Sequence, residues 1–266
     1  MKYAPIAECI YCGTTQQPLT DEHIIAYALG GDKILPKSSC GTCQTVTSKV
    51  ERSVLRDMLL QVRAQLGLPS RKKSLPKNMP LVVQYGDEQR TFELEKAKHP
   101  TMAQFLLYPM PGTLEGEAPE RGINVIGTQL YQVGGPPLKQ VLDALGTKNA
   151  TFSQEFKGSE LEKMLAKMAL AYAVAERGID GLRESPLQKI IQGEIDDVGK
   201  WIGCGLWHPE PNPNLHDLKL VESGKWLVVS VRLFAHLRTP EYLVVVRVGG
   251  ETDRPTFPHG ELVVEV

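Results

Sequence analysis

Two pairs of cysteines, one at each end of a short N-terminal segment, limit what this chain can fold into. The pairs are Cys9-Ile-Tyr-Cys12 and Cys40-Gly-Thr-Cys43. A CxxC turn presents two thiolates to one ion, and two such turns complete the tetrahedral ligand set of a structural zinc. Four thiolates leave no open coordination position for water, so the ion would have a structural role and not a catalytic one. The small unit around it would need the metal in order to fold. Free or redox-active pairs are the alternative, but two pairs together favour zinc.

An acidic residue and a histidine, Glu22 and His23, stand next to each other between the two pairs. The segment that holds them is longer than the ~15–20 residues of many zinc-ribbon patterns, so it carries more than a turn. A neutral histidine can take a proton from water near neutral pH, and a carboxylate can bind a divalent ion. Neighbouring residues of a strand point to opposite faces, so Glu22 and His23 share one site only if the strand bends or ends there.

The bulk composition is that of a soluble globular protein. The chain has 266 residues, of which 42% are hydrophobic and 23% charged, enough for one large domain or two smaller ones. A net charge of -1 neither indicates nor excludes nucleic-acid binding, because such binding depends on a local basic surface and not on the charge of the whole chain.

No segment has the apolar length of a signal peptide or a membrane span. We therefore expect a cytoplasmic protein without a membrane partner, a setting where paired thiols more often bind metal than form disulfides. The fifth cysteine, Cys204, is expected to be a small buried residue.

A helix is predicted to follow the second cysteine pair. From Thr45 onwards valine, leucine and methionine recur at three- and four-residue spacing, and Gly67 and Pro69 should end the helix. Residues 69–80 combine prolines with a cationic run, which predicts a basic linker. The predicted domains are therefore residues 1–68 and residues 81–266.

The second domain is expected to be mixed α and β. The predicted strands are residues 81–85, 91–94, 123–126, 226–234, 242–248 and 262–264. A helix is predicted over 160–177, with Ser159 and Glu162 as a capping box and Gly178 as the end. Strands gather late in the chain instead of alternating with helices, which favours an α+β fold. The proline-rich stretch with Trp207, His208, His216 and Asp217 is interpreted as a loop and not as a second site.

The motifs of the N-terminal segment occur in an order that resembles a known family. The order is Cys9-Ile-Tyr-Cys12, then Glu22-His23-Ile-Ile, then Gly30-Gly31, then Cys40-Gly-Thr-Cys43. This is similar to the HNH endonucleases, in the branch with a Glu-His-Ile-Ile motif and zinc-binding CxxC pairs, over about residues 9–60. The resemblance implies a ββα-metal fold in which two short strands carry the acidic-histidine pair. It also implies Mg²⁺- or Mn²⁺-dependent hydrolysis of DNA, with His23 as general base and with Glu22 and Gln44 as ligands of the catalytic ion.

The chain departs from the family pattern at two positions. Such proteins usually have Asn or His directly after the last cysteine, whereas this chain has Gln44. Glutamine offers the same carbonyl oxygen one methylene further out, and Mg²⁺ demands near-ideal octahedral geometry. Ser48 and Glu51 follow on the same helix face, and Glu51 is an alternative oxygen ligand. The stretch before Cys40 also contains no asparagine to match the middle residue of the motif.

Basic residues in and after this unit are predicted to contact phosphates. They are Lys49, Arg52, Arg71, Lys72 and Lys73. Such contacts give affinity for duplex DNA without sequence choice.

Two alternatives to an endonuclease are compatible with the sequence. The first is a non-catalytic nucleic-acid-binding protein that keeps the zinc knuckle but has a degenerate HNH site, which Gln44 and the missing asparagine favour. The second is a protein-interaction platform in which the knuckle is only a staple. The sequence leaves the oligomeric state and the role of residues 81–266 open.

Overall fold

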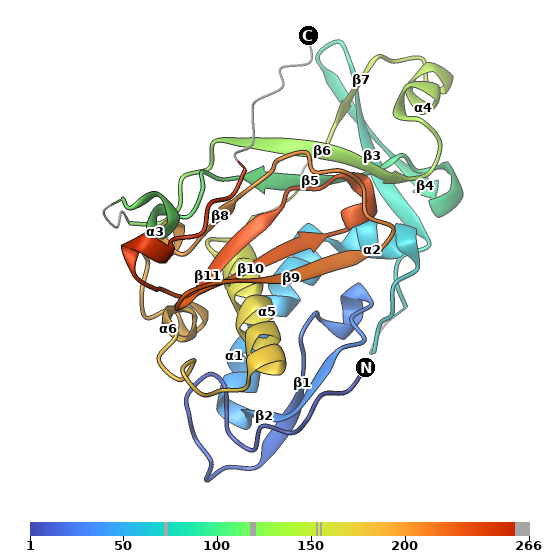
Figure 1. The fold of residues 1–266 in the computed structure, drawn as a ribbon. Coiled ribbons are helices and arrows are strands. Elements are labelled where there is room, and N and C mark those ends of the chain that lie inside the picture. The colour runs from blue at the N-terminus through green and yellow to red at the C-terminus, as the bar shows by residue number, and fades with distance from the viewer. Residues whose placement is uncertain (72–73, 118–120, 153, 155, 259–266) are drawn as a thin grey trace.

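The computed structural model describes residues 1–71, 74–117, 121–152, 154 and 156–258 (Figure 1). The N-terminal elements are β1 (Leu19–His23), β2 (Ile34–Cys40), α1 (Gly41–Ser53), a π-helical turn (Val54–Met58) and α2 (Leu60–Leu66). They are followed by β3 (Asn78–Tyr85), β4 (Glu88–Glu95), β5 (Thr101–Leu107), α3 (Gly112–Glu115), β6 (Gly127–Gly134), α4 (Leu138–Ala144) and β7 (Asn149–Thr151). The last elements are α5 (Glu160–Arg177), α6 (Pro186–Gln192), β8 (Ile202–Cys204), β9 (His216–Ser223), β10 (Trp226–Leu233) and β11 (Tyr242–Arg247). The mixed α and β class expected from the sequence is confirmed.

A four-stranded antiparallel sheet in the order β8-β11-β10-β9 lies at the centre. Every residue of β10 is buried, because the strand is covered on both faces. Val229 and Val231 belong to the main core, whereas Trp226 and Val228 belong to a smaller cluster on the other face. This alternation follows from the two-residue period of a strand, and burial on both faces explains the uninterrupted apolar run in the sequence.

Helix α5 is the central helix of the fold. It packs against β10 and β11 on one side and against α1 and α6 on the other (Figure 1). Its residues from Leu161 to Val174 are buried except for Lys163, and the buried ones include two charged residues, Glu162 and Lys167. No helix within the described ranges has the length and apolar character to span a membrane.

The N-terminal segment forms a β-hairpin followed by a helix. Strands β1 and β2 pair antiparallel, with Glu22 opposite Leu35 and His23 opposite Ile34. The register shifts between Thr20 and Glu22, and β1 ends at His23. The strand therefore has both the bulge and the end that the acidic-histidine pair needs to face one site.

The loop between β1 and β2 needs glycine at positions 30 and 31. Gly30 has φ +83°, a left-handed conformation that glycine adopts without strain. A Cβ on Gly31 would stand 2.0 Å from the carbonyl oxygen of Ile25, so no larger residue fits there.

The helix begins at Gly41, inside the second cysteine pair and before the predicted start at Thr45, and it has a π-helical turn in its middle. Helix α1 runs into the turn at Val54, α2 continues to Leu66, and Gly67 caps the end in a left-handed conformation. The predicted end at Gly67 is confirmed. The spacing of the apolar residues does not predict this π-helical turn. Such turns often occur at functional sites.

Two small sheets complete the structure. One has the order β4-β3-β7 and is covered by α4, whose Val141 and Leu142 pack on Leu81 and Val83. The other pairs β5 with β6. The main core combines buried residues from both sides of the predicted linker, for example Leu35 and Val50 with Leu165 and Val229. Strand β3 begins at Asn78, inside the predicted linker.

Three local predictions are wrong. Residues 123–126 are not a strand, because the pairing segment begins at Gly127. The capping box does not form: Ser159 makes no side-chain cap bond, and Glu162 turns inward to accept a hydrogen bond from Tyr108. His216 begins strand β9 instead of lying in a loop, and its Nε2 lies 2.8 Å from the carbonyl oxygen of Leu29. The predicted strand 262–264 falls outside the described residues.

Candidate metal centre and His23 pocket

The four cysteines of the two CxxC pairs converge on one point. The sulfur atoms of Cys9, Cys12, Cys40 and Cys43 all lie within 4.8 Å of one another. The Sγ atoms of Cys12 and Cys40 are 3.7 Å apart, close to the roughly 3.8 Å that tetrahedral geometry requires for zinc–sulfur bonds of about 2.3 Å. No disulfide joins them. The cluster can therefore hold a metal ion such as zinc.

Local backbone geometry positions the two halves of the cluster. In the first half Gly13, with φ +73°, donates its N–H to the carbonyl of Cys9 and closes the turn. In the second half Cys40 is the N-cap of α1 and Cys43 lies in the first helical turn, where the helix dipole favours thiolates. The N–H of Ile10 bonds to the carbonyl of Ser38 and joins the halves.

Helix α6 holds the first cysteine turn from outside. The side-chain amide of Gln188 donates to the carbonyl of Ile10, and that of Gln192 donates to the carbonyl of Tyr11, each at 2.8 Å. The two glutamines stand four residues apart and thus on one face of the helix. These bonds satisfy the buried carbonyls of the turn whether or not an ion is bound.

Burial acts against ionisation of two of the thiols. It raises the pKa of Cys9 and raises the pKa of Cys43 above its ordinary value. A coordinated divalent ion removes the proton outright, so binding of a metal would release protons from this cluster.

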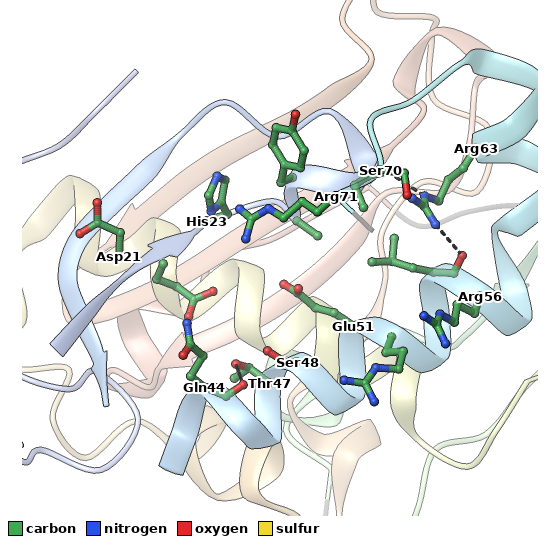
Figure 2. A pocket seen from close by; sticks show the side chains of 16 residues that line it. Asp21, His23, Gln44, Thr47, Ser48, Glu51, Arg56, Arg63, Ser70 and Arg71 are labelled. Atoms are coloured by element: carbon green, nitrogen blue, oxygen red, sulfur yellow. Dashed lines mark hydrogen bonds between the residues drawn. The ribbon is translucent and has the colours of Figure 1, made fainter. Parts of the chain in front are cut away.

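A pocket of about 530 Å³ lies between β1 and α1, and we call it the His23 pocket (Figure 2). It is lined by Asp21, Glu22, His23, Ala26, Tyr27, Ala28, Gln44, Thr47, Ser48, Glu51, Arg52, Leu55, Arg56, Arg63, Ser70 and Arg71. The pocket brings the strand-borne acidic-histidine pair together with the polar face of α1. Figure 2 shows Gln44, Thr47, Ser48 and Glu51 along the helix and His23 on the strand opposite.

A buried lysine from α5 contacts three of the residues that line this pocket. The Nζ atom of Lys167 lies 2.7 Å from Oε1 of Glu22 and 2.6 Å from Oε1 of Glu51. It also donates to the backbone carbonyl of His23 at 2.5 Å. The Lys167 side chain is 1% exposed, that of Glu22 is 8% exposed and that of Glu51 is 23% exposed. The ammonium therefore joins β1, α1 and α5 at a single atom.

Lys167 and the two carboxylates attract one another, but burial, together with the neighbouring Glu51, still raises the pKa of Glu22 above its ordinary value. Burial by itself lowers the pKa of Lys167, but the carboxylates of Glu22 and Glu51 outweigh burial and hold that pKa above its ordinary value. Lys167 is therefore an ammonium at neutral pH. A buried charge of this kind is tolerated only when it is paired and hydrogen-bonded, and all three ammonium protons have an acceptor here.

The imidazole of His23 is only partly buried. Its ring packs edge-on against Tyr27, with the ring centroids 5.9 Å apart, and neither ring nitrogen has a hydrogen-bond partner in the described part of the chain. Burial, followed by the nearby positive charges of Arg71 and Lys167, lowers the pKa of His23. A neutral imidazole with free nitrogens is available to accept a proton.

Gln44 is exposed and lines the same pocket as Glu22 and His23. In Figure 2 its amide points from α1 across the pocket towards the strand. Glu51, further along the same helix, directs its carboxylate towards the middle of the pocket. The structure thus places Gln44, Glu51 and the acidic-histidine pair around one pocket.

The predicted phosphate contacts divide into three groups. Arg52 and Arg71 line the His23 pocket, whereas Lys49 is exposed on α1 but does not line it. Lys72 and Lys73 lie outside the described residues. The structure adds Arg56 to the pocket wall.

Sequence reasoning missed two residues that organise the pocket. One is Lys167, whose signal is a single lysine inside the apolar run Leu165-Ala-Lys-Met-Ala-Leu-Ala. The other is Arg63, which is buried and donates to the carbonyls of Ala28, Leu55 and Pro69. A buried cation on the apolar side of a helix needs hydrogen-bond acceptors. The sequence therefore marks Lys167 and Arg63 as unusual positions, but it does not identify the acceptors.

No family model, curated protein or solved structure matches this chain.

Proposed function

We propose that the chain is a metal-dependent endonuclease that hydrolyses phosphodiester bonds in DNA. One observation carries the proposal: a histidine with free ring nitrogens, three carboxylates (Asp21, Glu22 and Glu51) and an amide line the same pocket, beside a four-cysteine cluster. The hairpin-helix order of β1, β2 and α1 agrees with the ββα-metal arrangement that the resemblance to HNH endonucleases implies.

The pocket residues fit a hard divalent ion. Glu22, Gln44 and Glu51 supply oxygen atoms, which Mg²⁺ and Mn²⁺ prefer. Lys167 contacts Glu22 and Glu51 through Oε1 in each case, so the metal ion would bind through Oε2 of these carboxylates. Glu22 and Gln44 would hold the ion, with Glu51 as the further oxygen ligand. When bound, such an ion neutralises the phosphate and stabilises the departing 3′ oxygen.

The side chains have separate roles in this reaction. His23 takes a proton from the attacking water, which its free nitrogens and lowered pKa permit. Lys167 holds Glu22 in place and also fixes the backbone at His23 through the carbonyl. Arg52 and Arg71, which line the pocket, would contact the phosphates of the substrate.

A second function has its own supporting observation. Lys167 already neutralises much of the negative charge of Glu22 and Glu51, so the pocket attracts a divalent ion less strongly than two free carboxylates would. Together with the missing middle asparagine, this supports a nucleic-acid-binding protein with a degenerate nuclease site. The second proposal predicts DNA binding without cleavage.

A zinc ion in the cysteine cluster is the first expected result. Protein purified without added metal should contain about one zinc per chain, the stoichiometry of a four-ligand site. Elemental analysis measures this directly. Cys40→Ser should lose the zinc, whereas Cys204→Ser should keep it, because Cys204 is not part of the cluster and is buried against Tyr108. A folded protein without zinc, or a disulfide between the pairs, contradicts this assignment.

Nicking of supercoiled plasmid with and without added Mg²⁺ or Mn²⁺ tests the endonuclease. Strong chelators are avoided, because they also strip structural zinc. We expect ion-dependent nicking by the parent chain, retained or raised nicking by Gln44→Asn, and reduced nicking by Gln44→Ala at limiting Mg²⁺. Asparagine keeps the carbonyl ligand with one less torsion to order, whereas alanine removes it.

Thr45→Ala is the matched control for the Gln44 series. Thr45 is exposed one residue further along α1 and does not line the pocket. If Gln44→Ala nicks as well as Thr45→Ala across a Mg²⁺ titration, the ligand role passes to Glu51. If the parent binds plasmid but no ion supports nicking, the non-catalytic alternative holds.

A further inference from the structure

A second hollow adjoins the His23 pocket. It has a volume of about 570 Å³, and its lining includes Leu68, Ser70, Arg71, Leu75, Lys77 and Lys96. Ser70 and Arg71 line both spaces. The two hollows therefore form one continuous surface that runs from His23 past Arg71 to the start of β3.

The charges along this surface change sign with distance from His23. Carboxylates line only the His23 pocket, and the described lining of the second hollow contains no acidic residue. Five cations follow the surface away from the acidic end: Arg52, Arg56, Arg71, Lys77 and Lys96. Within the described ranges none of the five forms an ion pair, so their charges are available to a ligand.

Lys77 and Lys96 stand at the far end of the surface. The N–H of Lys96 bonds to the carbonyl of Lys77 at 3.1 Å, which places the two residues side by side. The Nζ atom of Lys96 lies over Gly67, 3.6 Å from where a Cβ on that glycine would be. Lys98, two residues further on, is instead paired with Glu95 and lines neither hollow.

Contacts of Arg63 and Arg71 within the protein fix the backbone and the cation at the junction between the two hollows. Arg63 donates to the carbonyl of Pro69 at 3.1 Å, next to Ser70, and to the carbonyl of Ala28 at 2.8 Å. The guanidinium of Arg71 lies 5.0 Å from the centre of the Tyr27 ring, and Figure 2 shows its side chain extended towards His23. A ligand that enters thus meets a preformed cation between the two spaces, which lowers the entropy cost of binding.

We propose that the second hollow binds the sugar-phosphate backbone of a polynucleotide strand away from the bond to be cut. The proposal rests on the proposed function, and it deepens that function by naming an extended strand as the substrate. Lys77 and Lys96 contact phosphates, Arg71 bridges the two hollows, and Leu68, Leu75 and Pro76 give the sugars an apolar surface. A mononucleotide or very short oligonucleotide fills only the His23 pocket and gains nothing from the second hollow.

Salt-dependent binding of the 266-residue chain with His23→Ala tests this proposal without any cleavage. Fluorescence anisotropy, with no divalent ion added, gives the affinity for labelled DNA of about 30 nucleotides, single-stranded or duplex, over a series of salt concentrations. Each phosphate contact contributes about 0.9 to the slope of log affinity against log salt for duplex and about 0.7 for a single strand. Lys77→Gln/Lys96→Gln should therefore lower the slope by about 1.8 for duplex or about 1.4 for a single strand. The form of DNA that shows this loss is the form that occupies the hollow.

Two comparisons make the result specific. Lys98→Gln/Lys225→Gln changes the net charge equally at residues that line neither hollow, and it should leave the slope nearly unchanged. An oligonucleotide of about four nucleotides, at the lower end of single-strand site sizes, should bind the Lys77/Lys96 double variant as it binds the parent. Equal slopes for the two double variants on long DNA overturn the proposal. Because no cleavage is involved, a chain that binds with the expected slope but never nicks plasmid contradicts the endonuclease alone.

Discussion

Lys167→Met should lower the free energy of unfolding by about 3–5 kcal/mol, the cost of removing one partner from a buried ion pair. Methionine fills a similar volume but leaves the buried Glu22 carboxylate without its cation, and the carbonyl of His23 loses a donor. Glu51 loses the same partner, but because it is partly exposed to water its unpaired charge costs less free energy of unfolding. Urea unfolding followed by circular dichroism measures the change.

Two further variants separate this mechanism from simple loss of packing. Lys163→Met lies one turn earlier on α5, where the lysine is partly exposed and paired with Glu160, and it should cost under about 1 kcal/mol. Adding Glu22→Gln and Glu51→Gln to Lys167→Met should restore much of the stability, because the uncompensated charges are removed. If Lys167→Met unfolds within about 1 kcal/mol of the parent, the ammonium is not the cation that holds this site together.

The largest expected effect on activity is that of His23→Ala. Nicking should fall by about 10²–10⁴-fold, the usual contribution of a positioned general base. Folding should be nearly unaffected, because the imidazole has no hydrogen-bond partner among the described residues and Lys167 binds the backbone carbonyl, which alanine also has. Nicking rates, zinc content and thermal unfolding are measured on the same preparation.

His236→Ala is the comparison for this loss. His236 is a partly buried histidine that does not line the His23 pocket, so its replacement should leave nicking unchanged. Equal nicking by His23→Ala and His236→Ala would identify His23 as a structural residue and would remove the general base from the mechanism.

The sequence predicted those features that depend on residues close together in the chain. The cysteine pairs, the Gly30-Gly31 turn and the helix end at Gly67 each follow from local geometry, and the structure contains them. The 160–177 helix was predicted for the same reason, since its apolar residues recur within a single element.

What the sequence did not predict depends on partners far away in the chain. Lys167 meets the hairpin 144 positions before it, a contact that packing of α5 against α1 creates. Glu162 fits a capping box by spacing, yet burial turns it towards Tyr108. Residues 123–126 have the composition of a strand, but β5 pairs with the segment that begins at Gly127. In each case tertiary packing overrode the local preference.

The two glutamines of α6 limit how the cysteine cluster can be used outside this protein. Gln188 and Gln192 supply donors for the carbonyls of Ile10 and Tyr11, and these donors come from a distant part of the chain. A fragment that ends at residue 68 would present both carbonyls to solvent and would leave Glu22 without Lys167. Grafting the cluster onto another scaffold therefore means transplanting α5 and α6 with it, as a discontinuous unit assembled from two separate stretches of the sequence.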